Sequence, residues 1–233
     1  MSEVRTIGLL GGMSWESSIE YYRIINETVR AELGGLHSAK SIMVSVEFAE
    51  IEALQHQNRW DEAADILITA ARSLESGGAD FAIICTNTMH KVAAQIEESI
   101  NIPLIHIADA AAEVLLHEEI MTVGLLGTTF TMEQDFLKAR LAERHGLEII
   151  IPDAEDRAEV HRVIYEELIA GEVLDRSRDA YRAIIARLVE QGAQGVILGC
   201  TEIPLVLEAG DLPVPLIDTA RCHAEELFEQ AEG

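Results

Sequence analysis

The sequence predicts an α/β protein made of two similar domains with parallel sheets. Apolar, β-branched runs alternate with helical patterns that end at glycine, as expected for strands connected by helices in parallel sheets. The segment 79–90 also aligns without a gap on 193–204, at an offset of 114 (193 − 79). Two shorter matches occur in the same order, 7–11 with 123–127 and 102–105 with 214–217. A repeat of this length indicates two whole domains related by duplication.

The first half is predicted to contain four strands and three helices. Ser14 is a suitable N-cap for the first helix, in which Tyr21, Ile25 and Val29 recur at helical spacing before Gly34 stops it. The expected strands cover 6–10, 42–46, 81–85 and 104–107, and the other helices cover about 60–76 and the segment from 90 to 100.

The second half repeats this scheme. Its strands are expected over 123–126, 148–151, 196–198 and 215–217, with helices ending at 146, near 171 and near 191. We expect the chain to cross between domains near Pro103 and again near Pro213, so that the C-terminal helix packs on the first domain. The predicted domains are therefore 1–102 with 213–233, and 103–212.

Composition limits the classes of partner. With 41 acidic and 17 basic residues, the formal charge of −24 disfavours nucleic acid and anionic membranes. The start of the chain has no run long enough for a secretory or membrane-spanning segment. Three cysteines without CxxC spacing predict neither a disulfide framework nor a zinc site, and a reducing cytoplasm is the expected location.

Four polar loops follow the expected strands and mark the predicted site. Ligands of open parallel sheets bind at the carboxyl ends of the strands. The loops cover 11–14, 86–88, 127–129 and 200–202. The segment GLLGGMS lacks both common phosphate-loop motifs, and the eight histidines show no metal-binding pattern. We therefore expect no nucleotide and no metal, and interpret His90 and His106 as hydrogen-bonded structural residues.

The repeat places Thr86 opposite Cys200, each at the end of an apolar strand. This arrangement would direct one hydroxyl and one thiol at a shared cleft and suits a reaction with a proton-handling group on each face of a substrate. Cys85 is expected to be buried, since its side chain opposes that of Thr86 on a strand. It would reach the cleft only if the strand had already turned. Cys222 is interpreted as a small buried residue of a helix.

Several motifs resemble the aspartate/glutamate racemase family. They are GCTE at 199–202, TNTMH at 86–90, LLGGMS near the N-terminus and PLIDTA at 215–220. The resemblance covers the whole chain and looks closest to the broad aspartate/glutamate-specific branch. It implies two Rossmann-like domains, a site in the cleft between them, no cofactor and a homodimer. Hydantoin racemases, maleate isomerases and arylmalonate decarboxylases are similar relatives.

The resemblance implies one cysteine on each face of the substrate, and this chain departs from that pattern. The second cysteine falls on Cys200, but the first falls on Thr86. A thiol with a pKa of about 8.5 can be tuned to thiolate by nearby donors, whereas a hydroxyl ionises with far more difficulty. Our hypothesis is that Cys200 abstracts the α-proton while Thr86, with water, serves the other face. The enzyme should then be strongly asymmetric and, by analogy with similar Thr/Cys members of the family, faster from the L-isomer.

The remaining site residues are expected to hold the substrate. Residues predicted to bind it are Met13, Gln55, Asn87, Thr88, Thr129 and Thr201, with Glu202 and His90 supporting them. The Arg and Lys that grip a distal carboxylate in some family members are replaced by residues near Glu50–Ile51 and Ile169. Gln55, Arg59 or Arg157 are alternatives for that task. A related cleft enzyme and a catalytically weak amino-acid-binding protein also stay open.

Overall fold

The structure, a computed structural model, describes residues 5–207 and 212–232, with residues 228–232 described by their backbone alone. The described chain divides into two compact units, one ending at Ile107 and resuming at His223, the other spanning Ala108–Cys222. We call them unit 1 and unit 2. The divisions lie beyond the expected positions near Pro103 and Pro213. The reason is that a short strand follows each proline and completes the sheet of the unit that the chain then leaves.

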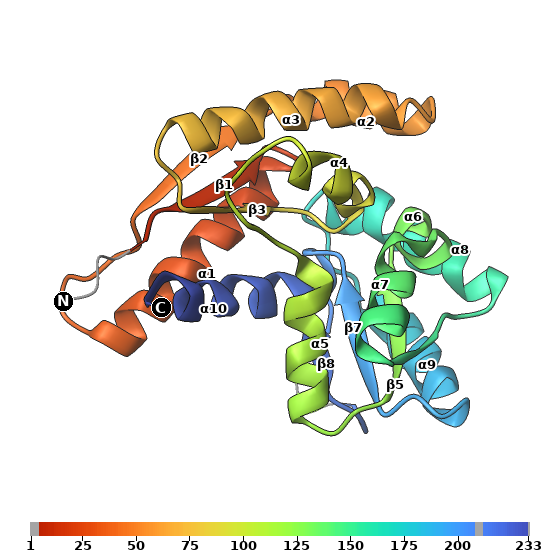
Figure 1. Cartoon of the computed structure of the whole chain (residues 1–233). Helices are drawn as coiled ribbons and strands as arrows, with labels where there is room; N and C mark the ends of the chain where they lie inside the picture. The colour runs from red at the N-terminus through yellow and green to blue at the C-terminus, as the bar shows by residue number, and fades with distance from the viewer. Residues whose placement is uncertain (1–4, 208–211, 233) are drawn as a thin grey trace. The chain divides into compact units, whose positions relative to one another are not determined.

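Each unit contains a parallel four-stranded sheet, as predicted (Figure 1). The two orders are equivalent, β2-β1-β3-β4 in unit 1 and β6-β5-β7-β8 in unit 2. The strands are β1 (Ile7–Gly11), β2 (Ser41–Ser45), β3 (Phe81–Ile84), β4 (Leu104–Ile105), β5 (Thr122–Gly127), β6 (Glu148–Ile150), β7 (Gly195–Gly199) and β8 (Leu216–Asp218).

The sheet register reproduces the sequence repeat. Leu10 pairs with Ile84 in unit 1, and Leu126 pairs with Leu198 at the equivalent place in unit 2. Ile84 and Leu198 are related by the offset of 114 (198 − 84) that also aligns Thr86 with Cys200. Thr86 and Cys200 therefore occupy equivalent positions, each two residues beyond a paired strand residue.

Helices connect all of these strands. Unit 1 has α1 (Trp15–Leu33), α2 (Phe48–His56), α3 (Trp60–Ser76), η1 (Thr88–Val92), α4 (Ala93–Glu97) and most of α10 (Thr219–Glu232). Unit 2 has α5 (Ile107–His117), α6 (Thr129–Glu133), α7 (Asp135–His145), α8 (Ala154–Val163), η2 (Ile164–Leu168), α9 (Asp175–Glu190) and η3 (Ile203–Leu205). Within the described ranges, no helix has the length and apolar character needed to cross a membrane.

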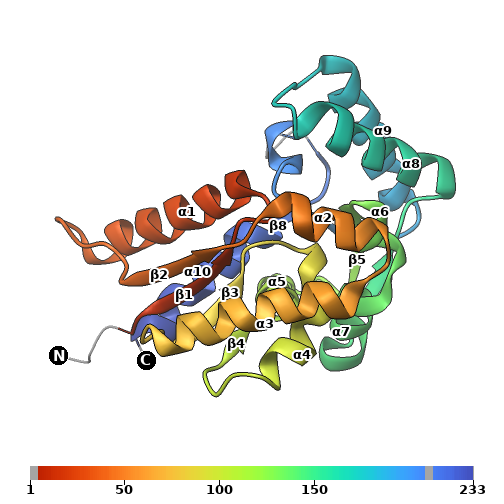
Figure 2. The same ribbon diagram turned by 90° about the horizontal axis from the view of Figure 1, so that it is seen from above.

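Helix α1 illustrates how the sequence determines an element. Ser14 caps it, its Oγ accepting the Ser17 N–H at 3.3 Å. Gly34 ends it with a φ of 70°, a conformation that glycine adopts without strain. The predicted stripe of Tyr21, Ile25 and Val29 is buried. Helices α1 and α3 lie on opposite faces of the first sheet (Figures 1 and 2), so both faces are covered.

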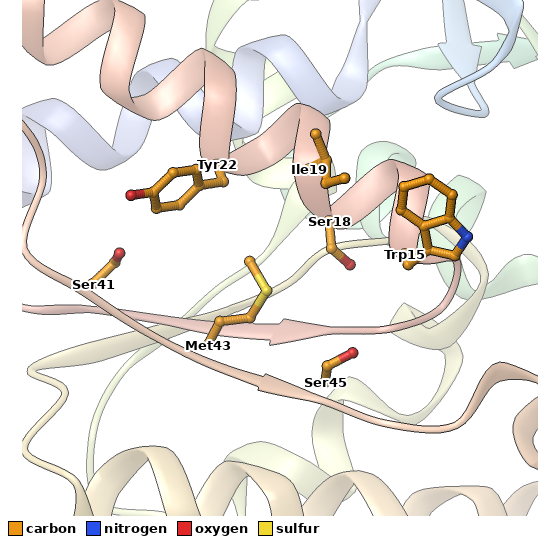
Figure 3. Close-up of a pocket in the computed structure, with 7 residues that line it drawn as sticks. All are labelled: Trp15, Ser18, Ile19, Tyr22, Ser41, Met43 and Ser45. Carbon is orange, nitrogen blue, oxygen red and sulfur yellow. The ribbon is translucent and has the colours of Figure 1, made fainter.

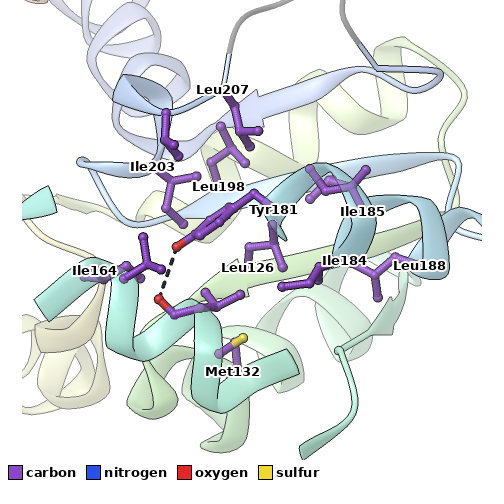
Figure 4. Close-up of a cluster of buried hydrophobic side chains, with 14 of the residues drawn as sticks. Leu126, Met132, Ile164, Tyr181, Ile184, Ile185, Leu188, Leu198, Ile203 and Leu207 are labelled. Atoms are coloured by element: carbon purple, nitrogen blue, oxygen red, sulfur yellow. Dashed lines mark hydrogen bonds between the residues drawn. The ribbon is translucent and has the colours of Figure 1, made fainter. Parts of the chain in front are cut away.

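The core of unit 2 lies between its sheet and the helices α8 and α9 (Figure 4). Tyr181 of α9 is fully buried there and donates its hydroxyl to the Val160 carbonyl at 3.1 Å. A Cβ at Gly124 of β5 would lie 2.9 Å from the side chain of Leu188, so the glycine lets α9 approach the sheet closely. This packing supports the strand end that carries Cys200.

Four helical segments differ from the sequence prediction. The helix expected to end at Gly146 is two helices, because Gln134 adopts an extended conformation between α6 and α7. The expected helix ending near Gly171 changes from α to π geometry at Ile164. Helices α2 and α5 were not predicted. Of these, α2 is only nine residues long and has little amphipathic contrast to reveal it.

Candidate functional site

The loop after β1 is held by serine contacts. Gly12 has a φ of 93°, and a Cβ there would lie 2.2 Å from the Val46 carbonyl oxygen, so only glycine fits. Ser18 Oγ accepts the Gly12 N–H at 2.8 Å and donates to the Ser14 carbonyl at 2.9 Å. Met13, predicted to line the site, is only 4% exposed. Its side chain belongs to the core of unit 1.

Thr86 lies at the first turn after β3. The Cys85 N–H still bonds the Leu10 carbonyl at 2.9 Å, and the Thr86 N–H then turns back to the Ile84 carbonyl at 2.8 Å. Thr86 is partly exposed, whereas Cys85 is fully buried. Burial raises the pKa of the Cys85 thiol far above its usual value. These observations match the expectation of a buried Cys85 and leave Thr86 as the accessible residue.

His90 forms hydrogen bonds that hold this turn in place. Its Nδ1 lies 2.8 Å from the Thr86 carbonyl oxygen, and its Nε2 accepts the Ile107 N–H at 3.2 Å. The ring is 3% exposed, so the prediction of a hydrogen-bonded structural histidine is confirmed. His106, also predicted to be structural, is equally buried beside it.

The other predicted binding residues of unit 1 differ in accessibility. Thr88 is partly exposed, but Asn87 is only 4% exposed. Gln55 is 7% exposed, and its amide nitrogen donates to the Met89 sulfur at 3.0 Å. The amide expected to hold a distal carboxylate is thus engaged inside unit 1.

In unit 2, Cys200 and Thr201 share one carboxylate. The Cys200 thiol donates to Glu202 Oε2 at 2.8 Å, and the Thr201 hydroxyl donates to the same oxygen at 2.9 Å. All three side chains are partly exposed. Glu202 is therefore in direct contact with the thiol.

The electrostatic environment of Cys200 favours the thiol over the thiolate. Burial, followed by the negative charge of Glu202, raises the pKa of Cys200 well above its usual value. Backbone N–H groups of Thr201 and Glu202 act in the opposite direction but are outweighed. The donors expected to tune the thiol are present. The resting group is nevertheless a thiol with a proton acceptor beside it.

The threonines after β5 form the second polar turn of unit 2. Thr128 caps α6 by accepting the Thr131 N–H at 3.4 Å, while Thr129 is partly exposed. The Thr129 N–H donates to His161 Nδ1 at 3.2 Å. The sequence did not indicate His161, because it lies 32 residues away and carries no motif. Its partly exposed ring packs against Tyr165 with centroids 4.6 Å apart.

Both arginines considered for a distal carboxylate are already paired. Arg59 donates to Glu62 and, at 2.9 Å, to Gln57. Arg157 donates to Glu133 at 3.0 Å and to the Pro152 carbonyl at 2.7 Å. Among the residues that the structure describes, no group of three or more His, Cys, Asp or Glu is arranged to hold a metal ion.

A hollow of about 540 Å³ lies between α1 and β2 in unit 1 (Figure 3). Its wall contains exposed apolar side chains and serines but no charged residue. The lining residues are Trp15, Ser18, Ile19, Tyr22, Ser41, Met43 and Ser45. None of the predicted site residues lines this hollow, which we call the α1–β2 face.

The chain belongs to a family of racemases. The family model for Asp/Glu/hydantoin racemases matches residues 10–227. This match confirms the family resemblance, and the two parallel sheets agree with the fold of its members. Racemases are isomerases, which defines the class of enzyme.

Individual relatives support this assignment. A crystal structure from Yersinia pestis, provisionally assigned as an Asp/Glu racemase, is 53% identical with a TM-score of 0.93, covering 97% of this chain and 99% of that one. An aspartate racemase homologue from Pyrococcus horikoshii OT3 is 36% identical with a TM-score of 0.88, covering 98% and 100%. The broad specificity amino-acid racemase RacX of Bacillus subtilis (strain 168) is 27% identical over 168 residues, 71% of this chain and 70% of that protein.

Proposed function

We propose that the protein is a cofactor-independent racemase of aspartate, glutamate or both, with a preference for the L-isomer. The contact between the Cys200 thiol and Glu202 Oε2 is the observation that carries the proposal. A thiol paired with a carboxylate can pass its proton on and become a base when the substrate is bound. The relation of Thr86 to Cys200 in the repeat supplies the second proton-handling group.

The proposed reaction begins at Cys200. As its proton moves to Glu202, the thiolate removes the α-proton, so that a C–H bond breaks and an S–H bond forms. The electron pair left on Cα spreads into the substrate carboxylate. The Thr86 hydroxyl, with water, then delivers a proton to the opposite face. Glu202 afterwards releases to water the proton it took from Cys200, and Thr86 takes up a proton from water.

The preference for one isomer follows from the difference between the two groups. In the reverse direction Thr86 must remove the proton, and a hydroxyl is much harder to ionise than a thiol. Cys200 has the adjacent carboxylate, whereas the contacts around Thr86 described above involve its backbone. Removal of the α-proton from the D-isomer by Thr86 should therefore be slower than its removal from the L-isomer by Cys200, and this difference should appear in the α-proton exchange of the two isomers.

Substrate recognition in this proposal depends mainly on hydroxyl groups. Thr88, Thr129 and Thr201 are partly exposed, so their hydroxyls and nearby backbone N–H groups are suited to hold the α-carboxylate as charge builds up. Asn87 and Gln55, which were also predicted to bind the substrate, are buried within unit 1. An acidic substrate is supported by the family and by the relatives' names, against a net charge of −24 that repels anions.

Solvent exchange tests the function directly. Purified protein is incubated in D₂O with L- and D-aspartate, L- and D-glutamate and a neutral amino-acid panel, and each enantiomer is analysed for deuterium at Cα. We expect deuterium in the inverted acidic product, starting faster from the L-isomer. Cys200→Ala should abolish exchange in both directions, with Cys222→Ala as the matched cysteine control. Full activity in Cys200→Ala would contradict the mechanism.

Hydantoin racemisation is a second candidate, because the family model that matches includes hydantoin racemases. A 5-substituted hydantoin added to the same panel tests it. Inversion of the hydantoin without exchange of any amino acid would replace the leading proposal. Binding of aspartate or glutamate without exchange of any substrate would favour an amino-acid-binding protein.

We also propose a homodimer whose contact is the α1–β2 face. Trp15, Ile19 and Tyr22 are 62%, 52% and 52% exposed, although large apolar side chains are usually buried. The face lacks charged lining residues, so a second copy with the same charge of −24 meets least repulsion there. Light scattering should give twice 25.6 kDa, and Ile19→Glu should give a monomer. Leu116→Glu, at an exposed apolar site in unit 2, is the control.

A cytoplasmic location completes the proposal. It rests on the cysteine pattern, since none of the three cysteines is in a disulfide. Fractionation of cells that express the protein, with markers for each compartment, tests it. Recovery outside the cytoplasmic fraction would contradict it.

A further inference from the structure

Unit 1 contains a buried cluster of three histidines and one tyrosine that the proposed reaction does not use. His90, His106, His223 and Tyr21 are each 3% exposed or less. The ring centroids of His90 lie 4.5 Å from His106 and 5.7 Å from His223, and those of His223 and Tyr21 lie 5.6 Å apart. The residues come from distant parts of the sequence, so tertiary folding brings them together.

The partners of His90 determine which nitrogen carries its proton. Nδ1 faces the Thr86 carbonyl oxygen, which can only accept, so Nδ1 must donate. Nε2 faces the Ile107 N–H, which can only donate, so Nε2 must present its lone pair. A proton on Nε2 would place two N–H groups against each other. The contacts therefore require the neutral Nδ1–H form of the ring.

His223 has the opposite arrangement. Its Nε2 lies 2.9 Å from the Ile105 carbonyl oxygen and donates to it, while Nδ1 lies 3.0 Å from the Tyr21 hydroxyl and accepts from it. Burial, followed by the rings of His106 and His223, keeps the pKa of His90 well below its usual value. The electrostatic environment and the hydrogen-bond geometry thus agree on a neutral His90.

The bonds of His90 join two functionally distinct pieces of chain. One end holds the peptide of Thr86, and the other holds Ile107, the first residue of α5 and the last residue of unit 1. Helix α5 thereby receives a partner for its first N–H, which helices otherwise leave unsatisfied. His223 holds Ile105 in the same segment. The Thr86 turn is therefore anchored to the segment 105–107, which both His90 and His223 hold by hydrogen bonds.

We propose that His90 is a positioning residue, whose Nδ1–H bond to the Thr86 carbonyl aims the Thr86 hydroxyl at the α-carbon of an amino-acid substrate. This inference rests on the proposed racemase function. It assigns a role to a residue that touches neither the thiol nor, in the proposed reaction, the substrate. A rigid Thr86 turn matters because small displacements of a reacting group reduce the rate strongly.

The proposal makes a specific prediction about how the carbanion intermediate partitions between the L- and the D-product. After Cys200 has removed the α-proton and its thiol has exchanged with D₂O, the carbanion intermediate is deuterated either by Cys200, which returns deuterated L-substrate, or by Thr86, which gives the deuterated D-isomer. Loss of the His90 bond should impair only the second route. The ratio of exchange to inversion is then the informative quantity, and a general loss of folding would not change it.

Two substitutions separate the two bonds of His90. His90→Asn places an amide donor where Nδ1 lies and keeps the contact with Thr86, whereas His90→Gln places an acceptor where Nε2 lies and keeps the contact with Ile107. Both replace an imidazole by an amide and remove one of its two bonds. His90→Gln should raise the ratio of exchange to inversion about tenfold, the effect of a lost hydrogen bond to a well-positioned group. His90→Asn should keep the ratio close to that of the unchanged protein.

The experiment measures deuterium in recovered L- and D-aspartate and glutamate at low conversion for the three proteins, with ¹⁵N NMR of the histidine side chains. Equal ratios in both variants and the unchanged protein would overturn the positioning role. An Nε2–H or doubly protonated His90 in the unchanged protein at pH 7 would overturn it without reference to activity. Absence of exchange and inversion in the unchanged protein would instead refute the racemase proposal. The ¹³C NMR signal of the Thr86 carbonyl would then decide the positioning role, since only His90→Gln should shift it strongly.

Discussion

Replacing Glu202 by Gln should make Cys200 more reactive and the enzyme less active. The substitution keeps the size of the side chain but removes the negative charge that lies 2.8 Å from the sulfur. That charge is second only to burial in raising the pKa of the thiol. Its loss should therefore increase the thiolate fraction at a given pH. The proposed proton acceptor is lost at the same time.

The size of this effect on the Cys200 thiol follows from the distance between its sulfur and Glu202 Oε2. Two unit charges 2.8 Å apart interact by about 1.5 kcal/mol at the dielectric constant of water, which corresponds to roughly tenfold in an equilibrium. Cys200 and Glu202 are partly buried, so this is a lower limit. We expect Glu202→Gln to increase the rate of Cys200 alkylation by about tenfold or more below the thiol pKa. Cα exchange should fall by at least about tenfold, as expected for loss of a general base.

Peptide-resolved mass spectrometry after a timed iodoacetamide pulse distinguishes Cys200 from Cys222, which is also partly exposed. Cys222 was predicted to be buried, but in the structure it is partly exposed. Glu166→Gln is the control, because Glu166 is an exposed carboxylate of unit 2, with a side-chain exposure of 67%. Unchanged or slower alkylation in Glu202→Gln would refute the electrostatic reasoning. Faster alkylation with full exchange activity would refute Glu202 as the proton acceptor.

Three further predictions concern the reacting pair and the cores. Thr86→Cys should increase the rate from the D-isomer by at least about tenfold, measured by chiral chromatography, while Thr86→Val should lower inversion in both directions; an unchanged L/D asymmetry in Thr86→Cys would contradict the assignment. Leu188→Ala should lower the free energy of unfolding by about 2–5 kcal/mol in urea titrations, because Leu188 is fully buried against the second sheet; a loss below 1 kcal/mol would contradict its packing role. The free energy of unfolding should fall as pH drops below about 6.5. The reason is that His90 becomes protonated in the unfolded chain, whereas the folded ring, with its lowered pKa, stays neutral. The pH dependence of the urea midpoint should be weaker in His90→Asn, and an identical profile would count against a buried neutral ring.

The sheets were predictable because their sequence signal is local and repeated. β-Branched runs and terminal glycines indicated eight strands, and all eight are present within one or two residues at most ends. Ser14 and Gly34 act at the ends of α1 through their own backbone chemistry. By contrast, the break at Gln134 and the π turn at Ile164 lie inside continuous helical patterns. Packing overrides local propensity at such places.

The equivalence of Thr86 and Cys200 was predictable from the sequence, but the protonation state of the thiol was not. The repeat alone selected Thr86 and Cys200, and the register of the two sheets places them at equivalent strand ends. Residue type suggested a thiol that donors would ionise. The direction of its pKa depends instead on burial and on the orientation of Glu202, which a sequence does not contain.

The sequence by itself therefore determined the family, the two parallel sheets and the pair of residues that differ between them, because each depends on neighbours along the chain or on a motif. Only the tertiary structure decided that Met13 and Gln55 are buried, that His161 lies beside Thr129 and that His90 holds the Thr86 carbonyl. The physical reason is that accessibility and hydrogen-bond partners arise from contacts between distant segments. Burial and charge then set the chemistry of each group, and neither is a property of the residue alone.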